Sequence, residues 1–233
     1  MIPSGLCNPA LIKNLGSLPG MYNLLLLNLS FKVFEKECVF ILGHSDKERT
    51  LILYSILGII KPKYGIINVL GHDLNNLSKI KLLEVRKKIG YVYPQNGLIK
   101  NITIKENISL PLRFNTTLTE KEINIKVEKI SKIFSISDYL NELYWDLDNT
   151  IEKKVLLARA IINNPSLLLI DEPSTYIEQK DIYIICELLD IILKRKFLSQ
   201  KASIIITSED FNLAEQKADR IFYLKHGEID ILK

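Results

Sequence analysis

Residues 167–173 read Leu-Leu-Leu-Ile-Asp-Glu-Pro, a short apolar run that ends in two adjacent carboxylates. Because the run is apolar throughout, it predicts a strand buried on both faces, as in a parallel sheet covered by helices. The carboxyl ends of such strands are where α/β proteins place their chemistry. Asp171 can bind Mg²⁺ there, and Glu172 can orient or deprotonate an attacking water. We therefore predict Asp171 as a metal- and cofactor-binding residue and Glu172 as a catalytic residue.

The composition indicates one α/β core rather than several domains. The chain has 233 residues, of which 47% are hydrophobic and 25% charged, with a net charge of +4. That positive excess is too small to indicate a nucleic-acid partner. The sequence shows neither an apolar run of about 18 residues nor a secretory signal pattern. The widely spaced Cys7, Cys38 and Cys186 predict reduced thiols in a cytoplasmic protein.

Apolar patterns divide the chain into alternating elements. Residues 1–20 hold three prolines and three glycines and are expected to be irregular. From residue 102 to 150 the pattern becomes helical, with a capping box at Thr119 and Glu122, which predicts a helical insertion between two halves of a sheet. The predicted strands are 24–33, 38–42, 66–70, 89–93, the run within 167–173, 203–207 and a pair near 221–231. The predicted helices are 51–57, 77–88, 151–162, 179–196 and 210–218.

Residues 43–50 read Gly-His-Ser-Asp-Lys-Glu-Arg-Thr between a predicted strand and a predicted helix. This is the place of the phosphate-binding loop G-x-x-x-x-G-K-[ST], in which glycines let backbone N–H groups wrap phosphates. The lysine of that loop reaches the terminal phosphates, and its Ser or Thr binds Mg²⁺. Gly43 and Thr50 match the pattern, so both are candidate cofactor-binding residues, and Thr50 is also a candidate Mg²⁺ ligand.

Three positions of this octet depart from the pattern. Glu48 stands where the second glycine belongs, and Asp46 stands where many such loops have another glycine. Both add negative charge where a polyanion would bind. Arg49 replaces the lysine and is a candidate cofactor-binding residue, although its planar fork is not equivalent to an ammonium group.

With its flanking segments, the chain resembles the ATP-binding subunits of ABC transporters over about residues 22–230. The first landmarks are the strand entering the Walker A loop at 40–43 and the Q-loop region at 89–95. The helix after the signature follows at 155–160, and Asn164-Pro165 leads into the Walker B run at 167–173. The last landmarks are the closing segments at 218–221 and 227–229. The resemblance implies an α/β P-loop NTPase fold: an ABC-type ATPase core with an antiparallel β portion and an inserted helical subdomain at about 98–163. It also implies a single domain spanning 1–233.

The same resemblance implies cofactors and partners. ATP and Mg²⁺ would be the cofactors, with Gln95 as a further cofactor-binding residue. The partners would be a transmembrane permease and a second ATP-binding subunit, with no nucleic acid. The protein would be cytoplasmic and peripheral on the membrane through the permease. Residues 106–113 are further similar to the ATPases of lipid-trafficking, MCE-associated importers, which implies lipid transport.

The chain departs from this family at several functional positions. The LSGGQ signature reads Leu-Asp-Asn-Thr-Ile at 147–151, so Asp148 would repel the phosphate that the signature normally binds. Ser208 replaces the switch histidine, and the D-loop ends Tyr-Ile-Glu at 176–178. Continuous alignment places Pro94 rather than Gln95 at the glutamine position. Tyr22 is the nearest candidate for the aromatic residue that stacks on adenine.

Three functions follow from these matches and departures. The first is a degenerate transporter ATPase subunit with lost or much-reduced hydrolysis and a structural or regulatory role. The second is a divergent but active ATPase, in which Arg49 replaces the lysine and the loop tolerates Asp46 and Glu48. The third is a soluble interaction module without a permease. Weak nucleotide binding through Thr50, Arg49 and Asp171 is a further alternative that the sequence allows.

Overall fold

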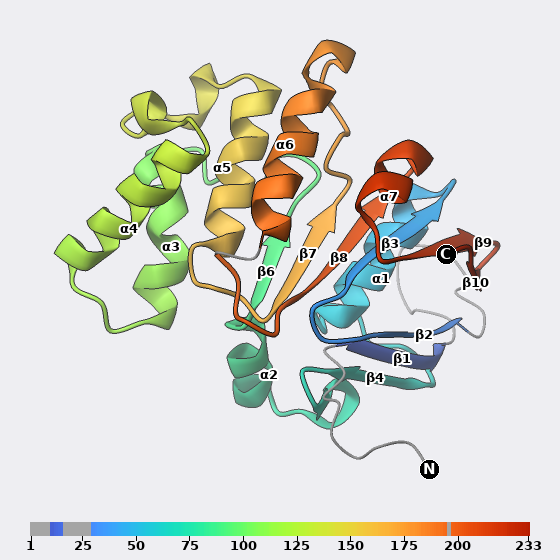
Figure 1. Cartoon of the computed structure of the whole chain (residues 1–233). Helices are drawn as coiled ribbons and strands as arrows, with labels where there is room; N and C mark the ends of the chain where they lie inside the picture. Colours follow the sequence, from blue (N-terminus) through green and yellow to red (C-terminus); the bar gives the residue numbers. More distant parts are fainter. Residues whose placement is uncertain (1–9, 16–28, 195–196) are drawn as a thin grey trace.

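The computed structural model of the protein describes residues 10–15, 29–194 and 197–233, and its backbone forms two sheets with helices around them (Figure 1). The larger sheet has the strand order β10-β9-β3-β8-β7-β6, and the smaller has the order β2-β1-β4-β5. The strands are β1 (Ala10–Leu15), β2 (Leu29–Val33), β3 (Cys38–Gly43), β4 (Ile66–Val69), β5 (His72–Asp73), β6 (Ile89–Val92), β7 (Leu167–Asp171), β8 (Ser203–Ser208), β9 (Arg220–Lys225) and β10 (Glu228–Ile231). All pairings in the larger sheet are parallel except β10 with β9, and all pairings in the smaller sheet are antiparallel.

This arrangement confirms the expected α/β core with a separate antiparallel β portion. The helices are α1 (Asp46–Ile56), α2 (Lys79–Arg86), α3 (Ile104–Asn115), α4 (Glu120–Ile133), α5 (Asn149–Ile161), α6 (Ile182–Leu193) and α7 (Phe211–Lys217). Short 3₁₀ turns are η1 (Leu74–Asn76), η2 (Ser137–Tyr139), η3 (Tyr144–Asp146) and η4 (Gln179–Asp181). The sequence predicted most of these elements to within a few residues of their ends.

The expectation that residues 1–20 are irregular is wrong for part of that range. β1 is one of the two inner strands of the smaller sheet, where Ala10 pairs with Val33 of β2 and with Val69 of β4. Both partners lie far along the chain, so no local pattern reveals the pairing. The prediction of a strand over 24–33 is confirmed for β2, and its residues 24–28 lie outside the described residues.

Two apolar cores lie on opposite faces of the larger sheet. Successive side chains of a strand point to opposite faces, and the five apolar residues of β3 therefore divide between them. Phe40 and Leu42 join the core that includes α3, α4, α5 and α6, whereas Val39 and Ile41 join the core beneath α1 and the smaller sheet. This division fixes α1 and α5 on opposite faces, with the carboxyl ends of β3 and β7 between them.

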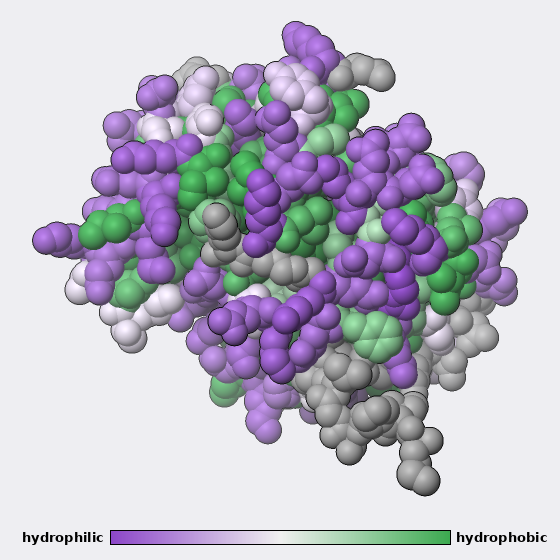
Figure 2. Space-filling view, viewed as in Figure 1, coloured by the Kyte–Doolittle hydropathy of each residue, from purple (hydrophilic) through white to green (hydrophobic). Residues whose placement is uncertain are grey.

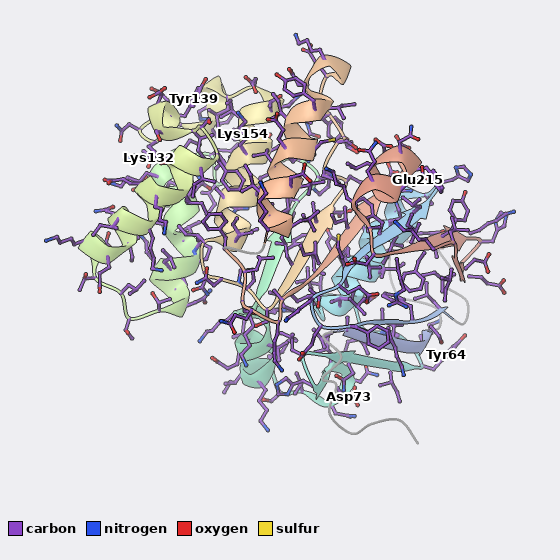
Figure 3. The ribbon with its side chains drawn as sticks, in the orientation of Figure 1. Tyr64, Asp73, Lys132, Tyr139, Lys154 and Glu215 are labelled. Carbon is purple, nitrogen blue, oxygen red and sulfur yellow. The ribbon has the colours of Figure 1, made fainter. Side chains whose placement is uncertain are left out.

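The predicted helical insertion is formed by α3, α4 and α5, and Figure 3 shows its labelled Lys132 and Tyr139 far from Tyr64 and Asp73 of the smaller-sheet region. The capping box predicted at Thr119 is confirmed, because its hydroxyl accepts from the Glu122 N–H and the Glu122 carboxylate accepts from the Thr119 N–H. A second capping box at Thr103 begins α3 in the same way. The surface around these elements is largely hydrophilic (Figure 2).

Gly43 has a packing role that does not involve a ligand. It ends β3 beside β9, and a Cβ built on it would lie 2.6 Å from the backbone oxygen of Leu224. No ordinary atom pair tolerates that distance, so any other residue at position 43 would force β3 and β9 apart.

We predict that Gly43→Ala lowers the free energy of unfolding by about 1–3 kcal/mol, because overpacking at this strand pair has no flexible atom to displace. Urea unfolding without any nucleotide measures this change. An unchanged free energy of unfolding would contradict the packing role of Gly43.

Candidate nucleotide site

Asp171 lies at the centre of a buried hydrogen-bond network at the end of β7. Its side chain is fully buried and accepts hydrogen bonds from three hydroxyl groups. Thr50 of α1 donates at 2.9 Å to Oδ2, Tyr91 of β6 donates at 2.9 Å to the same oxygen, and Thr207 of β8 donates at 2.7 Å to Oδ1. The structure thus brings together the two predicted Mg²⁺ ligands, Thr50 and Asp171, and adds two partners that the sequence analysis missed.

Sheet register explains these two missed partners. β6 and β8 flank β7, and Thr207 is the direct parallel partner of Asp171. Burial and the neighbouring Asp171 carboxylate raise the pKa of Tyr91, so its hydroxyl remains protonated and donates. The only sequence signal was a hydroxyl group near the end of each strand, and it had no meaning until the strand order was known.

The predicted phosphate-binding loop is very short. β3 ends at Gly43 and α1 begins at Asp46, so only His44 and Ser45 connect the strand to the helix. Ser45 is the N-cap and accepts a hydrogen bond from the Glu48 N–H at 3.3 Å. The Arg49 N–H donates to the Ser45 carbonyl within the helix at 3.1 Å. The predicted start of this helix near residue 51 was therefore too late.

α1 begins close to the end of β3 because the residues at its start favour helix initiation. Ser45 is a favoured N-cap, and Asp46 and Glu48 complement the positive end of the helix dipole. A glycine at position 48 would weaken that tendency, since glycine is a poor helix former. The Glu48 and Arg49 N–H groups, which would otherwise be available to a phosphate, are consequently bonded to Ser45.

The Arg49 guanidinium group is completely buried and has three acceptors. Its Nε donates to Glu172 Oε1 at 2.6 Å, and its Nη2 lies 2.6 Å from Asp46 Oδ1. Its Nη1 donates to the Gly43 carbonyl. The group therefore joins the end of β3, the first turn of α1 and the end of β7.

Glu172 is buried and held in an unusual backbone conformation. Its φ of 49° lies in the left-handed region that non-glycine residues rarely adopt. Its N–H donates to the Thr207 carbonyl at 3.1 Å, which anchors the backbone there. Burial raises the pKa of the Glu172 carboxyl, and the Arg49 guanidinium opposes that shift by favouring the charged form.

Lys153 of α5 is a second buried cation at this site, and sequence reasoning missed it. Its Nζ donates to the Pro94 carbonyl at 2.8 Å and to the Glu172 carbonyl at 3.1 Å. Burial lowers the pKa of Lys153 to about 8, although the nearby Glu152, Asp171 and Glu172 carboxylates favour its charged form. The acid pair is therefore faced by two cations from the chain itself. A lysine at an inward position of a predicted helix was the available signal.

Gln95 lies beside this cluster without joining it. It lines a pocket of about 10 Å³, roughly the room of one water, together with Glu152 and Lys153. Glu152 Oε1 is buried there and has no hydrogen-bond partner among the residues that the structure describes. Across the same described part of the chain, Gln95 makes no hydrogen bond to Thr50, Arg49 or Asp171.

The signature position also carries its own anion. α5 begins at Asn149, and the Asp148 carboxylate caps it by accepting from the Ile151 N–H at 2.8 Å. The Asp148 carboxylate therefore occupies the positive end of this helix, where it would repel a phosphate as expected. Ser208, at the switch position, is buried and accepts from the Asp210 N–H at 3.0 Å. Tyr22, the candidate adenine partner, lies outside the described residues.

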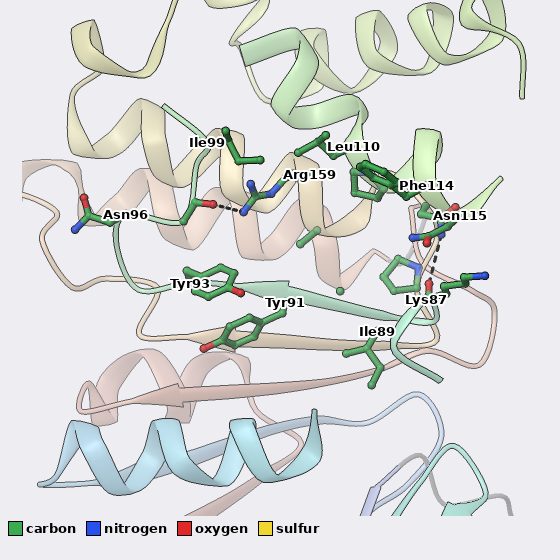
Figure 4. A pocket seen from close by; sticks show the side chains of 16 residues that line it. Lys87, Ile89, Tyr91, Tyr93, Asn96, Ile99, Leu110, Phe114, Asn115 and Arg159 are labelled. Carbon is green, nitrogen blue, oxygen red and sulfur yellow. Dashed lines mark hydrogen bonds between the residues drawn. The ribbon is translucent and has the colours of Figure 1, made fainter. Parts of the chain in front are cut away.

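A groove of about 630 Å³ lies between the larger sheet and the helical insertion, and Figure 4 shows side chains from both entering it. Its exposed apolar surface comes from Tyr93, Ile99 and Phe114, and Phe114 is 78% exposed. Arg159 of α5 supports the wall by donating to the Gly97 carbonyl at 2.7 Å. The groove is suited to an amphipathic helix with a bulky apolar side chain.

The fold and this site define a class of protein. A parallel sheet with a strand–loop–helix unit at residues 38–56, and an acid pair ending a strand of the same sheet, are the features of P-loop nucleoside triphosphatases. In the described part of the chain, every helix is too short or too polar to cross a membrane.

Comparison with known proteins identifies the family. The family model described as ABC transporter matches residues 26–175, and the chain belongs to that family. An uncharacterized ABC transporter ATP-binding protein of Methanocaldococcus jannaschii is 31% identical over 88% of this chain and 78% of its own length. The methionine import ATP-binding protein MetN 1 of Bacillus cereus is 28% identical over 88% of this chain, which spans only 58% of that protein.

A solved structure agrees with this assignment. The dimeric post-hydrolysis state of an ATP-binding cassette bound to ADP and phosphate has a TM-score of 0.84 and 26% identity to this chain. The match covers 96% of this chain and 99% of that one. The expected fold, with an ABC-type ATPase core, is therefore confirmed.

We predict that the free energy of unfolding rises between pH 8 and pH 9.5, before most tyrosines titrate. In that window unfolded Lys153 keeps a proton that folded Lys153, with its pKa of about 8, has released. The rise from this residue amounts to about 2 kcal/mol. Chemical denaturation across the pH range measures it.

Lys153→Met should flatten this rise, whereas Lys154→Met should keep it, because Lys154 is more exposed on the same helix (Figure 3). An equally steep rise in Lys153→Met would contradict the assignment.

Proposed function

We propose that this chain is the ATP-binding-cassette subunit of a membrane ABC transporter in which ATP hydrolysis is lost or much reduced. Its role would be structural or regulatory. The observation that carries the proposal is the buried Arg49 guanidinium, which bonds Glu172, Asp46 and the Gly43 carbonyl at the place where phosphate would bind. Members of the family bind ATP with Mg²⁺, and in this chain Thr50 and Asp171 are the residues that would hold the metal.

The charge balance of the site supports loss of nucleotide chemistry. Asp171 and Glu172 are faced by Arg49 and Lys153, so the acid pair is compensated without a metal ion. Breaking the buried Arg49–Glu172 pair leaves an uncompensated charge, which typically costs about 3–5 kcal/mol. A bound nucleotide would have to supply that free energy in addition to its own binding.

The hydrogen-bonding groups support the same proposal. The Asp171 carboxylate already accepts from three hydroxyls, and the first turn of α1 carries Asp46 and Glu48. Glu172, the proposed catalytic residue, is held by Arg49 and is not free to orient a water. The residues present therefore fit ATP·Mg²⁺ poorly.

The second phosphate-binding surface of a cassette would be blocked as well. In a cassette dimer the signature of one subunit faces the nucleotide of the other, and here the Asp148 carboxylate caps that helix. A homodimer would therefore have two impaired sites. A heterodimer with an active partner would have one site with this chain's loop and one with its signature.

The groove beside Tyr93 and Phe114 is the surface that we propose docks a transmembrane permease. Peripheral attachment to the cytoplasmic side of a membrane would follow from that contact. The proposed helical subdomain, about 98–163 within a single domain 1–233, supplies one wall of the groove. Because residues 106–113 resemble those of lipid-trafficking importers, a lipid is the transported substrate that we propose.

We predict that calorimetry with roughly millimolar Mg²⁺-ATP detects no binding to the wild-type chain. The double variant Glu48→Gly/Arg49→Lys should gain binding. It would free the N–H groups of the first helical turn that are bonded to Ser45, and it would release Glu172 from its bond with Arg49. Asp171→Asn added to that variant should abolish the gain. Wild-type binding with micromolar affinity that Asp171→Asn abolishes would contradict the proposal and favour the divergent, active ATPase.

We predict that the wild-type chain co-purifies with an integral membrane protein from detergent extracts of its native cells, as identified by mass spectrometry. Phe114→Ser should abolish that recovery, because it removes the most exposed apolar side chain of the groove. Phe211→Ser is the matched control, since Phe211 is 49% exposed on the distant helix α7. Equal recovery with both variants would contradict docking through the groove, and no recovery with wild type would favour the soluble interaction module.

A further inference from the structure

We propose that α2 and the turn before β4 form a basic surface that binds the anionic phospholipid headgroups of a membrane. We define this basic surface as Lys61, Lys63, Lys79, Lys81 and Lys88 together with the exposed apolar residues Ile80 and Leu83. Its orientation toward the bilayer rests on the proposed docking of a permease. Its affinity for anionic lipid does not.

The positive charge of the chain is concentrated in this segment. Residues 57–88 hold seven Lys or Arg and only two Asp or Glu, a net charge of +5. The whole chain carries +4, so the remaining residues together are slightly acidic. The overall charge that appeared too small to indicate a polyanionic partner therefore conceals one local excess.

These charges are available to an external partner. All five lysines of the basic surface are exposed, and none of them forms a salt bridge with any residue that the structure describes. Lys87 differs, because it pairs with Glu84 on the same helix at 2.7 Å. Clusters of four to eight basic residues are typical of surfaces that bind anionic lipids, and two of the five lysines here, Lys79 and Lys81, lie on α2 itself.

Apolar side chains lie among the lysines. Ile80 is 75% exposed and Leu83 is 55% exposed, and their spacing of three residues places them on one face of α2. Figure 2 shows mainly hydrophilic side chains over α2. Exposed aliphatic residues flanked by lysines are suited to insertion between headgroups.

The helix is rigidly attached to the core. Arg86 Nε donates to the Leu57 carbonyl at 2.8 Å, and its Nη2 donates to the Gly58 carbonyl at 3.0 Å. Leu82 packs against Gly58, where a Cβ would lie 2.9 Å from its Cδ1. The basic surface is therefore presented in a fixed orientation.

The basic surface adjoins the proposed docking groove. Lys87, the C-cap of α2, and Ile89, the first residue of β6, line that groove. A permease helix seated there would place this side of the protein near the bilayer. Lipid is favoured over nucleic acid, because Ile80 and Leu83 would contribute to insertion and would add nothing to binding a phosphate backbone.

The test is co-sedimentation of the purified full chain with vesicles, without permease or ATP. We compare phosphatidylcholine vesicles with vesicles in which about one third of the lipid is phosphatidylglycerol, at low salt. Wild type should bind only the anionic vesicles. Lys79→Gln/Lys81→Gln/Lys88→Gln should weaken this binding about ten-fold or more.

The matched control is Lys126→Gln/Lys129→Gln/Lys132→Gln on α4, which removes the same charge elsewhere; Figure 3 labels Lys132 there, far from α2 in Figure 1. It should change binding by less than about two-fold. Ile80→Ser/Leu83→Ser should also weaken binding about ten-fold. Thermal unfolding of each variant confirms that it is folded.

Three results would overturn the proposal. The first is failure of wild type to bind anionic vesicles. The second is an equal loss in both lysine variants, which would assign the binding to total charge. The third is tight binding to an oligonucleotide that Ile80→Ser/Leu83→Ser leaves unchanged, with weak vesicle binding, which would assign the basic surface to nucleic acid. Because permease and ATP are absent, failure here is separate from failure of the proposed transporter role.

Discussion

The buried guanidinium group of Arg49 is the constraint on which the site depends. A charge taken out of water is tolerated only when it is paired and hydrogen-bonded. Arg49 meets that condition through Glu172, Asp46 and the Gly43 carbonyl, which come from three different elements. The side chain therefore fixes the end of β7 against α1. The early start of α1 brings Asp46 into reach, so the short loop and the ion pair support each other.

A continuous set of contacts connects this site with the proposed docking groove. The Tyr91 hydroxyl donates to Asp171, and the Tyr91 ring lies 4.5 Å from the Tyr93 ring between centroids. Tyr93 lines the groove, and Lys153 binds the Pro94 carbonyl just beyond it. A partner seated in the groove would thus contact residues bonded to the acid pair.

The sequence predicted the parts of the fold that depend on local pattern. The apolar run of β7, the capping box of α4 and the end of α5 all lie close to where they were expected. The error at β1 has a different origin, because that strand is stabilised by pairing with two strands distant in the chain. The start of α1 was predicted too late because residues 43–50 match the position of the family loop, although Ser45 is a favoured N-cap.

The residues of the site likewise divide into those that motif spacing predicts and those that only the tertiary structure reveals. Thr50 and Asp171 were found from motif spacing, and the structure joins them by a hydrogen bond. Thr207 and Lys153 were missed, because their roles depend on strand order and on which face of α5 is turned inward. No motif spacing contains that information.

The sequence by itself determined the α/β class, the family resemblance, the order of the elements and the positions at which the family motifs are altered. These are properties of local composition and spacing along the chain. Only the tertiary structure decided that Arg49 is buried against Glu172 and that Asp171 is enclosed by three hydroxyls. The physical reason is that charge compensation and burial depend on distances between segments far apart in sequence, which are set when the sheets and helices pack together.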